Sequence, residues 1–345
     1  MKSKKDHHKL IRNGLFCLFS GNALFLLLLI TRLGVAAEPQ EKKSYGPKDL
    51  GLATSLNKKA QEYYKRGKYS AAEPLLKKAL AIRKAVFGTE HEEVVPSLYN
   101  LAMLYYAQGK YAQAESLHKR VLAIDEKALG QDDPDIATDL SNLASLYHAQ
   151  ERYDEAEPLH KRALAILEKA LGPNHPHVAT SLNNLAMLYL AREEYSEVES
   201  LLQQALKIDE RALGKNHPDV ARDLNNLAEL YRDQERYEKA EPLQQRALAI
   251  DEKALGRDHP HVATDLNNLA LLYQARGKYA KAEPLYQRSL VIVERSLGPE
   301  HPYLATGLKN YADLLRLTKR ETEAKKKEAR AEAIRATHAE RHRQK

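Results

Sequence analysis

The sequence predicts an all-α protein, a stack of seven two-helix repeats, and three observations support this prediction. Glycine, asparagine and alanine each recur at intervals of 42 residues, which indicates a repeat architecture. The apolar residues inside each interval follow the spacing of two helices. No stretch alternates in the way of a strand, which excludes a propeller of similar period. The three series are Gly88, Gly130, Gly172, Gly214, Gly256 and Gly298; Asn100, Asn142, Asn184, Asn226, Asn268 and Asn310; and Ala60, Ala102, Ala144, Ala186, Ala228, Ala270 and Ala312.

Each repeat contains two helical stripes separated by a short break. Leu182 and Tyr189 lie on one face of a first helix, and residues 191–194 form the break that follows it. A second stripe is clearest from Ala156 onwards and ends at Gly172, which predicts a left-handed C-cap. One hairpin cannot bury its apolar stripe alone, so stacked hairpins are expected to share a continuous core.

Three segments carry a family resemblance: Leu182-Asn183-Asn184-Leu185-Ala186-Met187-Leu188-Tyr189, Ala240-Glu241-Pro242-Leu243 and Gly256-Arg257-Asp258-His259-Pro260. They resemble the tetratricopeptide repeat of the kinesin light chain type, which is also common in bacterial proteins. The resemblance covers about residues 53–335. It implies a right-handed superhelical solenoid whose first helices line a concave groove for a protein or peptide partner. We expect the seven repeats over residues 53–338, with a polar capping helix from Glu321 to about His338 and a frayed, charged tail over residues 339–345.

The N-terminus has the pattern of a secretory signal. A basic head precedes an apolar stretch from Gly14 to Thr31, and Val35-Ala36-Ala37 predicts cleavage before Glu38. The apolar stretch just reaches the length that crosses a bilayer, so an uncleaved membrane anchor over residues 14–31 is the alternative. Both interpretations place the rest of the chain across the cytoplasmic membrane, in the periplasm or outside the cell. Residues 38–52 are rich in proline, glycine and charge, and we expect a linker there.

The net charge of +7 lies at the two ends of the chain. Residues 1–37 are net +5 and residues 316–345 net +6, whereas the stretch between them is net −4. A nucleic-acid-binding protein concentrates its basic residues on one folded face, so we expect no nucleic-acid partner. The single cysteine, Cys17, lies in the N-terminal segment, so the repeats are expected to contain no disulfide.

The asparagine series is the main candidate for a binding site. The resemblance implies that Asn100, Asn142, Asn184, Asn226, Asn268 and Asn310 hold the backbone of an extended segment. An amide donates and accepts hydrogen bonds at once, so a row of amides can hold a chain without reading its sequence. The alternative is that each asparagine bridges neighbouring helices, because buried polar groups need partners.

Side chains beside this series are expected to select the partner. The candidates are Asn183, Asn225, Asn267, Arg222, Arg232 and Met187. The two arginines lie near the middle of the predicted groove and favour an acidic or mixed internal segment.

Nothing in the sequence indicates an enzyme, a metal or a cofactor. The chain has no Gly-rich phosphate loop, nucleophile elbow or paired metal motif. Histidines recur in the loops between repeats, but equivalent positions in stacked hairpins lie at least a helix-packing distance of ~8–10 Å apart. We therefore expect structural roles for these histidines, which are His91, His175, His217, His259 and His301.

Together these observations predict a monomeric, non-enzymatic scaffold or adaptor that binds an extended protein or peptide segment. Its contact with the membrane is expected only through the N-terminal segment. Two alternatives remain: a structural or assembly protein of the cell envelope that associates end to end, and the regulatory subunit of an enzyme complex.

Overall fold

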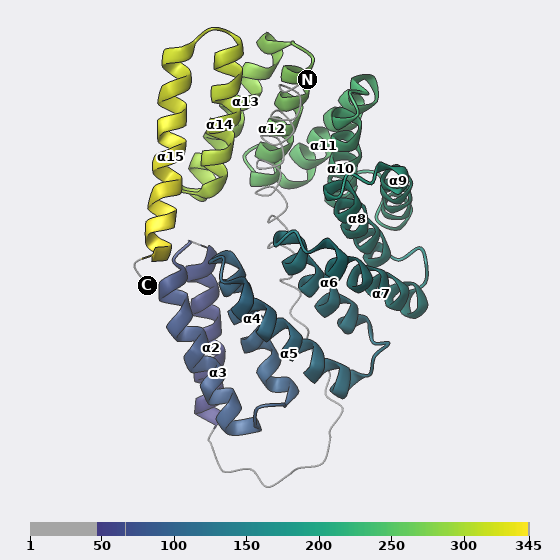
Figure 1. The fold of residues 1–345 in the computed structure, drawn as a ribbon, viewed down its shortest axis with the longest axis vertical. Helices are drawn as coiled ribbons and strands as arrows, with labels where there is room; N and C mark the ends of the chain where they lie inside the picture. The colour runs from purple at the N-terminus through teal and green to yellow at the C-terminus, as the bar shows by residue number, and fades with distance from the viewer. Residues whose placement is uncertain (1–46, 66, 344–345) are drawn as a thin grey trace. The chain divides into compact units, whose positions relative to one another are not determined.

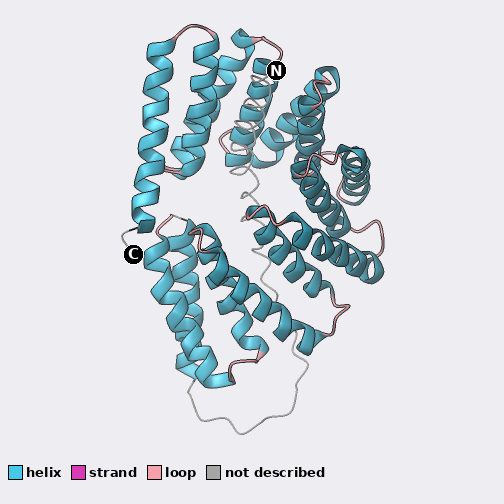
Figure 2. Cartoon of the chain, in the orientation of Figure 1, coloured by secondary structure: helices cyan, strands magenta, loops and turns pink. Residues whose placement is uncertain are grey.

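The computed structural model describes residues 47–65 and 67–343, and all regular secondary structure in these ranges is helical (Figure 2). Within these ranges, fourteen α-helices form seven hairpins, which confirms the predicted all-α stack of two-helix repeats. The first helices are α2 (Pro47–Lys65), α4 (Val95–Ala107), α6 (Pro134–Ala149), α8 (Pro176–Ala191), α10 (Pro218–Asp233), α12 (Pro260–Ala275) and α14 (Pro302–Leu317). The second helices are α3 (Tyr69–Phe87), α5 (Tyr111–Leu129), α7 (Tyr153–Leu171), α9 (Tyr195–Ala212), α11 (Tyr237–Leu255), α13 (Tyr279–Leu297) and α15 (Glu321–Arg343).

The chain divides into two compact units inside α9. The N-terminal unit ends at Ile208 and the C-terminal unit begins at Asp209. Within each unit, the second helix of one hairpin packs on the first helix of the next, as α5 does on α6 and α13 on α14 (Figure 1). The first helices also contact one another directly, as α10, α12 and α14 do in turn. The row of first helices in each unit is called its first-helix face below.

Small and branched side chains fill the core at each contact between hairpins. In the N-terminal unit, Ile136 and Leu140 of α6 pack with Ala163 of α7 and with Val178 and Leu182 of α8. Ala163 is fully buried, and its small side chain lets α7 approach its neighbours closely. A substitution of a large core residue by alanine typically costs 2–5 kcal/mol, so contacts of this kind dominate the stability of the stack.

The loop histidines cap the first helices. In each case Nδ1 of the ring accepts a hydrogen bond from the backbone N–H two residues later, as His259 does from His261 at 3.2 Å. Asp133 does the same with its carboxylate at 2.9 Å. The proline that follows occupies the first turn, where its missing N–H costs nothing. The same bond is made by His175, His217 and His301, whereas His91 makes it at the start of a short 3-10 helix (Glu92–Val94) that precedes α4.

Three sequence-based expectations about local structure need correction. The predicted linker over residues 38–52 overlaps α2, which begins at Pro47, because proline and an acidic first turn at Asp49 favour a helix start. The last helix continues to Arg343, since no glycine or proline stops it after His338. Gly172 has φ 85° and ψ 156°, which is not the left-handed helical C-cap that the sequence predicts.

No helix of the described ranges is long and apolar enough to span a bilayer. The predicted signal segment over residues 1–37 and the first part of the predicted linker lie outside the described residues.

Candidate functional site

The predicted asparagine series lies on the first helices of both units. Asn100, Asn142 and Asn184 belong to the N-terminal unit, and Asn226, Asn268 and Asn310 belong to the C-terminal unit. Five of the six side chains are half-buried, and Asn226 is buried. Five of the six amides therefore lie at the border of the core, and Asn226 lies inside it.

The six amides differ in what they contact. Asn184 and Asn268 make no side-chain hydrogen bond with any described residue. Asn310 donates to the side-chain oxygen of Asn267 at 3.0 Å, and Asn100 accepts from Gln61 at 3.4 Å. Asn184 and Asn268 are thus the two amides most open to a partner, one in each unit.

The second asparagine row, which we expected to select the partner, contacts the protein itself. Asn183 is 3% exposed and donates to the backbone carbonyl of Ala179 at 3.1 Å. Asn225 donates to Oδ1 of Asp265 at 2.6 Å, which links α10 to α12. The same link joins Asn57 to Ser97 between α2 and α4. The contacts of Asn225 and Asn57 tie neighbouring hairpins together, whereas that of Asn183 stays within α8.

Arg222 is surrounded by carboxylates of the C-terminal unit. Its guanidinium lies 2.8 Å from Asp219, 3.2 Å from Asp209 and 3.3 Å from Asp223. These neighbours already neutralise the arginine, so the structure gives it little capacity to attract an acidic partner.

Arg232 is held in a similar way but is more deeply buried. Its side chain is 10% exposed and contacts Glu229 at 3.1 Å and Asp233 at 2.9 Å. Burial raises the pKa of Glu229 to about 7, although Arg232 opposes that rise. The expectation that Arg222 and Arg232 choose acidic segments therefore has no support from their surroundings.

Apolar and small polar side chains complete the first-helix face. Met187 is half-buried on α8, as are Met103 and Tyr106 on α4. In the C-terminal unit, Thr264 and Leu271 occupy α12 and are also half-buried. These side chains are available to contact side chains of a bound segment.

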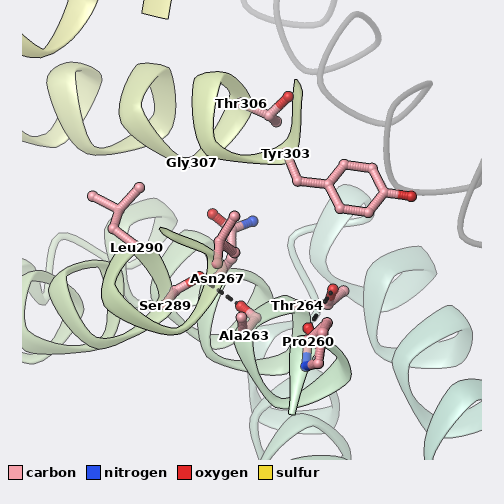
Figure 3. A pocket seen from close by; sticks show the side chains of 10 residues that line it. Pro260, Ala263, Thr264, Asn267, Ser289, Leu290, Tyr303, Thr306 and Gly307 are labelled. Atoms are coloured by element: carbon pink, nitrogen blue, oxygen red, sulfur yellow. Dashed lines mark hydrogen bonds between the residues drawn. The ribbon is translucent and has the colours of Figure 1, made fainter. Parts of the chain in front are cut away.

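A small cavity lies between α12, α13 and α14. Asn267, Thr264 and Ser289 line it together with Tyr303 and Gly307, and Figure 3 shows the amide of Asn267 between the two first helices. Its volume of about 30 Å³ exceeds the ~10–15 Å³ that one water molecule needs. It is far below the ~300–1,000 Å³ of typical ligand pockets.

Sequence reasoning missed three pairs of buried aspartates. In each pair, the second helix of one hairpin supplies one aspartate and the first helix of the next hairpin supplies the other. The pairs are Asp125 with Asp139, Asp209 with Asp223, and Asp251 with Asp265, and all six residues are buried. The sequence does carry a signal: these acids interrupt apolar stripes, and the last two pairs are separated by one repeat length.

Two second helices also bury a histidine. His118 and His160 are 3% and 2% exposed, and burial lowers the pKa of each to about 4. Both rings therefore remain neutral above that pH. Among the described residues, no group of three histidine, cysteine or acidic side chains is arranged to hold a metal ion.

The glutamates that precede prolines in the second helices are structural links. Glu157 accepts a hydrogen bond from the hydroxyl of Tyr189 at 3.0 Å, and Glu241 accepts one from Tyr273 at 3.1 Å. Each bond joins a second helix to the first helix of the next hairpin.

Comparison with known proteins identifies the repeat. The sequence profile described as "Tetratricopeptide repeat" matches residues 52–127, 135–211, 199–253, 219–290 and 262–337, and a second profile of the same description matches residues 99–166. No curated protein matches the chain by sequence.

Solved structures of similar proteins include two with kinesin light chain repeats. A putative kinesin light chain from Podosopora anserina with nearly identical TPR-like repeats is 29% identical, with a TM-score of 0.52 over 61% of this chain and 98% of that one. BtubC (BKLC) from P. vanneervenii is 26% identical, with a TM-score of 0.52 over 72% of this chain and 91% of that one. A Rap protein complexed with Competence and Sporulation Factor shares the fold at 16% identity, with a TM-score of 0.63 over 87% of this chain and 78% of that one.

Proposed function

We propose that this chain, which belongs to the tetratricopeptide repeat family, is a non-enzymatic scaffold that holds an extended segment of a partner protein on its first-helix faces. The fold is typical of protein–protein interaction scaffolds. The proposal rests on Asn184 and Asn268. The amides of both are half-buried and make no hydrogen bond to any described residue. An amide in that position usually has a partner, and a peptide backbone offers both the donor and the acceptor that it needs.

The comparison structures support the same kind of role. The Rap protein, which shares this fold, was solved in complex with Competence and Sporulation Factor. Selection of the partner falls to the half-buried positions beside the amides, such as Met187 and Leu271, because Arg222 and Arg232 are occupied by carboxylates of the chain. The partner segment is therefore expected to contribute apolar and uncharged side chains rather than a run of acids.

The test is capture of a partner from an envelope extract by the full-length chain and by its Asn184→Ala/Asn268→Ala variant. The matched control is Asn174→Ala/Asn216→Ala, which removes one exposed loop asparagine from each unit. A protein retained by the wild type and the control but lost by the first variant supports the proposal. Equal capture by all three chains, with unchanged helicity, would exclude a role for these amides.

The N-terminal segment directs the chain across the cytoplasmic membrane in this proposal. Mass spectrometry of the chain isolated from the membrane and soluble envelope fractions distinguishes its two forms. A mature N-terminus at Glu38 is the expected result of cleavage, whereas intact residues 1–37 in the membrane fraction would establish an anchor. Recovery of the intact chain from the cytoplasm would exclude export.

The scaffold is proposed to act as a monomer. Over residues 321–337, the terminal helix α15 buries the apolar side chains Ala324, Ala331 and Ile334, and most of its other side chains there are charged. Such a surface disfavours end-to-end association. Light scattering at increasing concentration is expected to give the monomer mass, and a mass that grows with concentration would favour an assembly protein instead.

A further inference from the structure

The three buried aspartate pairs occur at one repeated position of the hairpin interface. The other interfaces use different residues there: Arg83 with Ser97, Leu167 with Ser181, and Val293 with Gly307. Buried acids are thus not required by the fold, since the same interface forms with an apolar pair. This contrast makes the acid pairs a separate chemical feature.

The pair Asp251 and Asp265 is deeply buried in the C-terminal unit, at 4% and 1% exposure. Asp265 Oδ1 accepts a hydrogen bond from Asn225 at 2.6 Å. No other donor among the described residues reaches Asp251 Oδ1 or Asp265 Oδ2. The two carboxyl groups interact across the α11–α12 interface, where burial and the charge of Asp251 raise the pKa of Asp265. A close contact between two buried carboxyl groups is favourable only with a proton on one of them.

The pair Asp209 and Asp223 lies at the same position of the preceding interface. Arg222 lies 3.2 Å from Asp209 and 3.3 Å from Asp223, so the two carboxyl groups are close together, and burial and the charge of Asp223 raise the pKa of Asp209. Two ionised carboxylates that are both buried beside one guanidinium repel each other strongly. Their removal from water adds to the free-energy cost of keeping both ionised. One shared proton removes most of that repulsion.

We propose that Asp209 with Asp223 and Asp251 with Asp265 each share one proton in the folded stack, and that loss of this proton as the pH rises loosens the hairpin interfaces that contain them. This loss of a proton changes the stability of the hairpin interfaces and does not depend on the identity of the partner. Asn225, which bonds to Asp265, lies on the first-helix face, so the pair is also linked to the face that we propose binds a segment.

The pH range follows from the burial of the pairs. Burial raises the pKa of Asp209 to about 7 and that of Asp251 to about 6, and it raises the pKa of Asp265 well above its usual range. Because these values exceed the ~3.9 of an unfolded aspartate, the stabilisation is complete below that value. It is lost as the pH rises through the folded values, between about 4 and 7.

Other charged groups near the pairs modify this response. Asp219 raises the pKa of both Asp209 and Asp251, and Glu252 raises that of Asp265. His261 Nδ1 lies 3.9 Å from Asp251, and its protonation at lower pH would add an attractive charge. Asp219 itself lies 3.3 Å from Nδ1 of His217. These groups change the pH at which the interfaces loosen. The shared proton determines that they loosen as the pH rises and not as it falls.

The experiment is hydrogen exchange of the full-length chain between pH 5 and pH 7.5, analysed by segment and corrected for the intrinsic exchange rate. The α13–α14 interface, with Val293 and Gly307 at the equivalent positions, is the internal control (Figure 3). The opening equilibrium of the α11–α12 interface is expected to rise with pH relative to this control, by up to roughly tenfold per pH unit. An identical pH response at both interfaces would overturn the proposal.

The Asp265→Asn variant supplies the second measurement. Its amide can still donate to Asp251 and accept from Asn225, so the interface should form with its pH response removed. If this variant does not fold, infrared spectroscopy of the wild type decides the question. A protonated-carboxyl band at pH 5 that remains in Glu229→Gln and disappears by pH 7.5 supports the proposal, and its absence from that variant at pH 5 overturns it.

Discussion

The carboxylate of Glu115 is the best place to measure how strongly two neighbouring hairpins are linked. It accepts hydrogen bonds from Arg152 at 2.7 Å and from the hydroxyl of Tyr147 at 3.1 Å, and it pairs with Lys119 at 2.7 Å. The guanidinium of Arg152 also lies over the ring of Tyr147, 4.2 Å from its centroid. Glu115 of α5 therefore contacts side chains of both α6 and the loop that follows α6.

The magnitude follows from the pKa of this carboxyl group. Hydrogen bonding by Arg152 lowers it to about 2 from 4.5, with smaller help from Lys119 and Tyr147. A shift of that size corresponds to about 3 kcal/mol. Solvent screens the partly exposed Arg152, and we therefore expect about 1–2 kcal/mol for Glu115→Gln.

The assay is urea unfolding followed by far-UV circular dichroism at neutral pH and at pH 3. The folded pKa is lowered, so the stabilisation is present above the unfolded value of about 4.3 and is lost as the pH falls towards 2. The difference between wild type and Glu115→Gln should therefore shrink at pH 3. Glu155→Gln is the control, because it removes an exposed partner of the same Arg152. Equal midpoints for Glu115→Gln and wild type at neutral pH, or an equal loss in Glu155→Gln, would refute the reasoning.

Three further predictions concern the loops. Gly256→Ala should destabilise the chain by about 1–3 kcal/mol in urea unfolding, because φ 92° with ψ 152° is a conformation that side chains other than glycine rarely adopt. Glu235→Gly should stabilise it by about 1 kcal/mol, since Glu235 has φ 58° where sister repeats use Gly109 and Gly277; a lower unfolding midpoint would contradict this. His259→Asp should keep the cap of α12 and remove its acid sensitivity. Burial lowers the pKa of His259, so the cap of the wild type is complete above about 6.5 and weakens as the pH falls. Thermal unfolding between pH 5 and pH 7.5 tests that difference.

The repeat period predicted most of the fold because it reports packing that every hairpin shares. A residue such as Ala186 is buried in the same environment in each repeat, so its recurrence locates the close contact without any coordinates. Local caps were harder to predict. A histidine before proline has no side-chain oxygen, yet its Nδ1 reaches the same backbone N–H that a carboxylate reaches from Asp133. Helix-start rules that consider only oxygen acceptors overlook this equivalence.

The candidate site was predicted less well, because its electrostatics depend on residues from several helices. Asp219 and Glu229 each precede an arginine by three residues on the same helix, so the sequence alone could have indicated that Arg222 and Arg232 are paired. Asp209 is different: it lies on the preceding helix and approaches Arg222 only when the hairpins stack.

The charge of the first-helix face of the C-terminal unit depends on how its ionisable residues interact, so it is not the sum of their separate charges. Arg222 carries a fixed charge, but its neighbour Asp209 shares a proton with Asp223 in our proposal, so the charge of the cluster depends on pH. Below neutral pH the protonated pair leaves Arg222 with fewer charged neighbours. As the pH rises, the added negative charge makes the cluster a weaker site for an acidic segment. Binding of a partner beside Arg222 would thus depend on the protonation state of Asp209 and Asp223 as well as on the side chains that contact the partner.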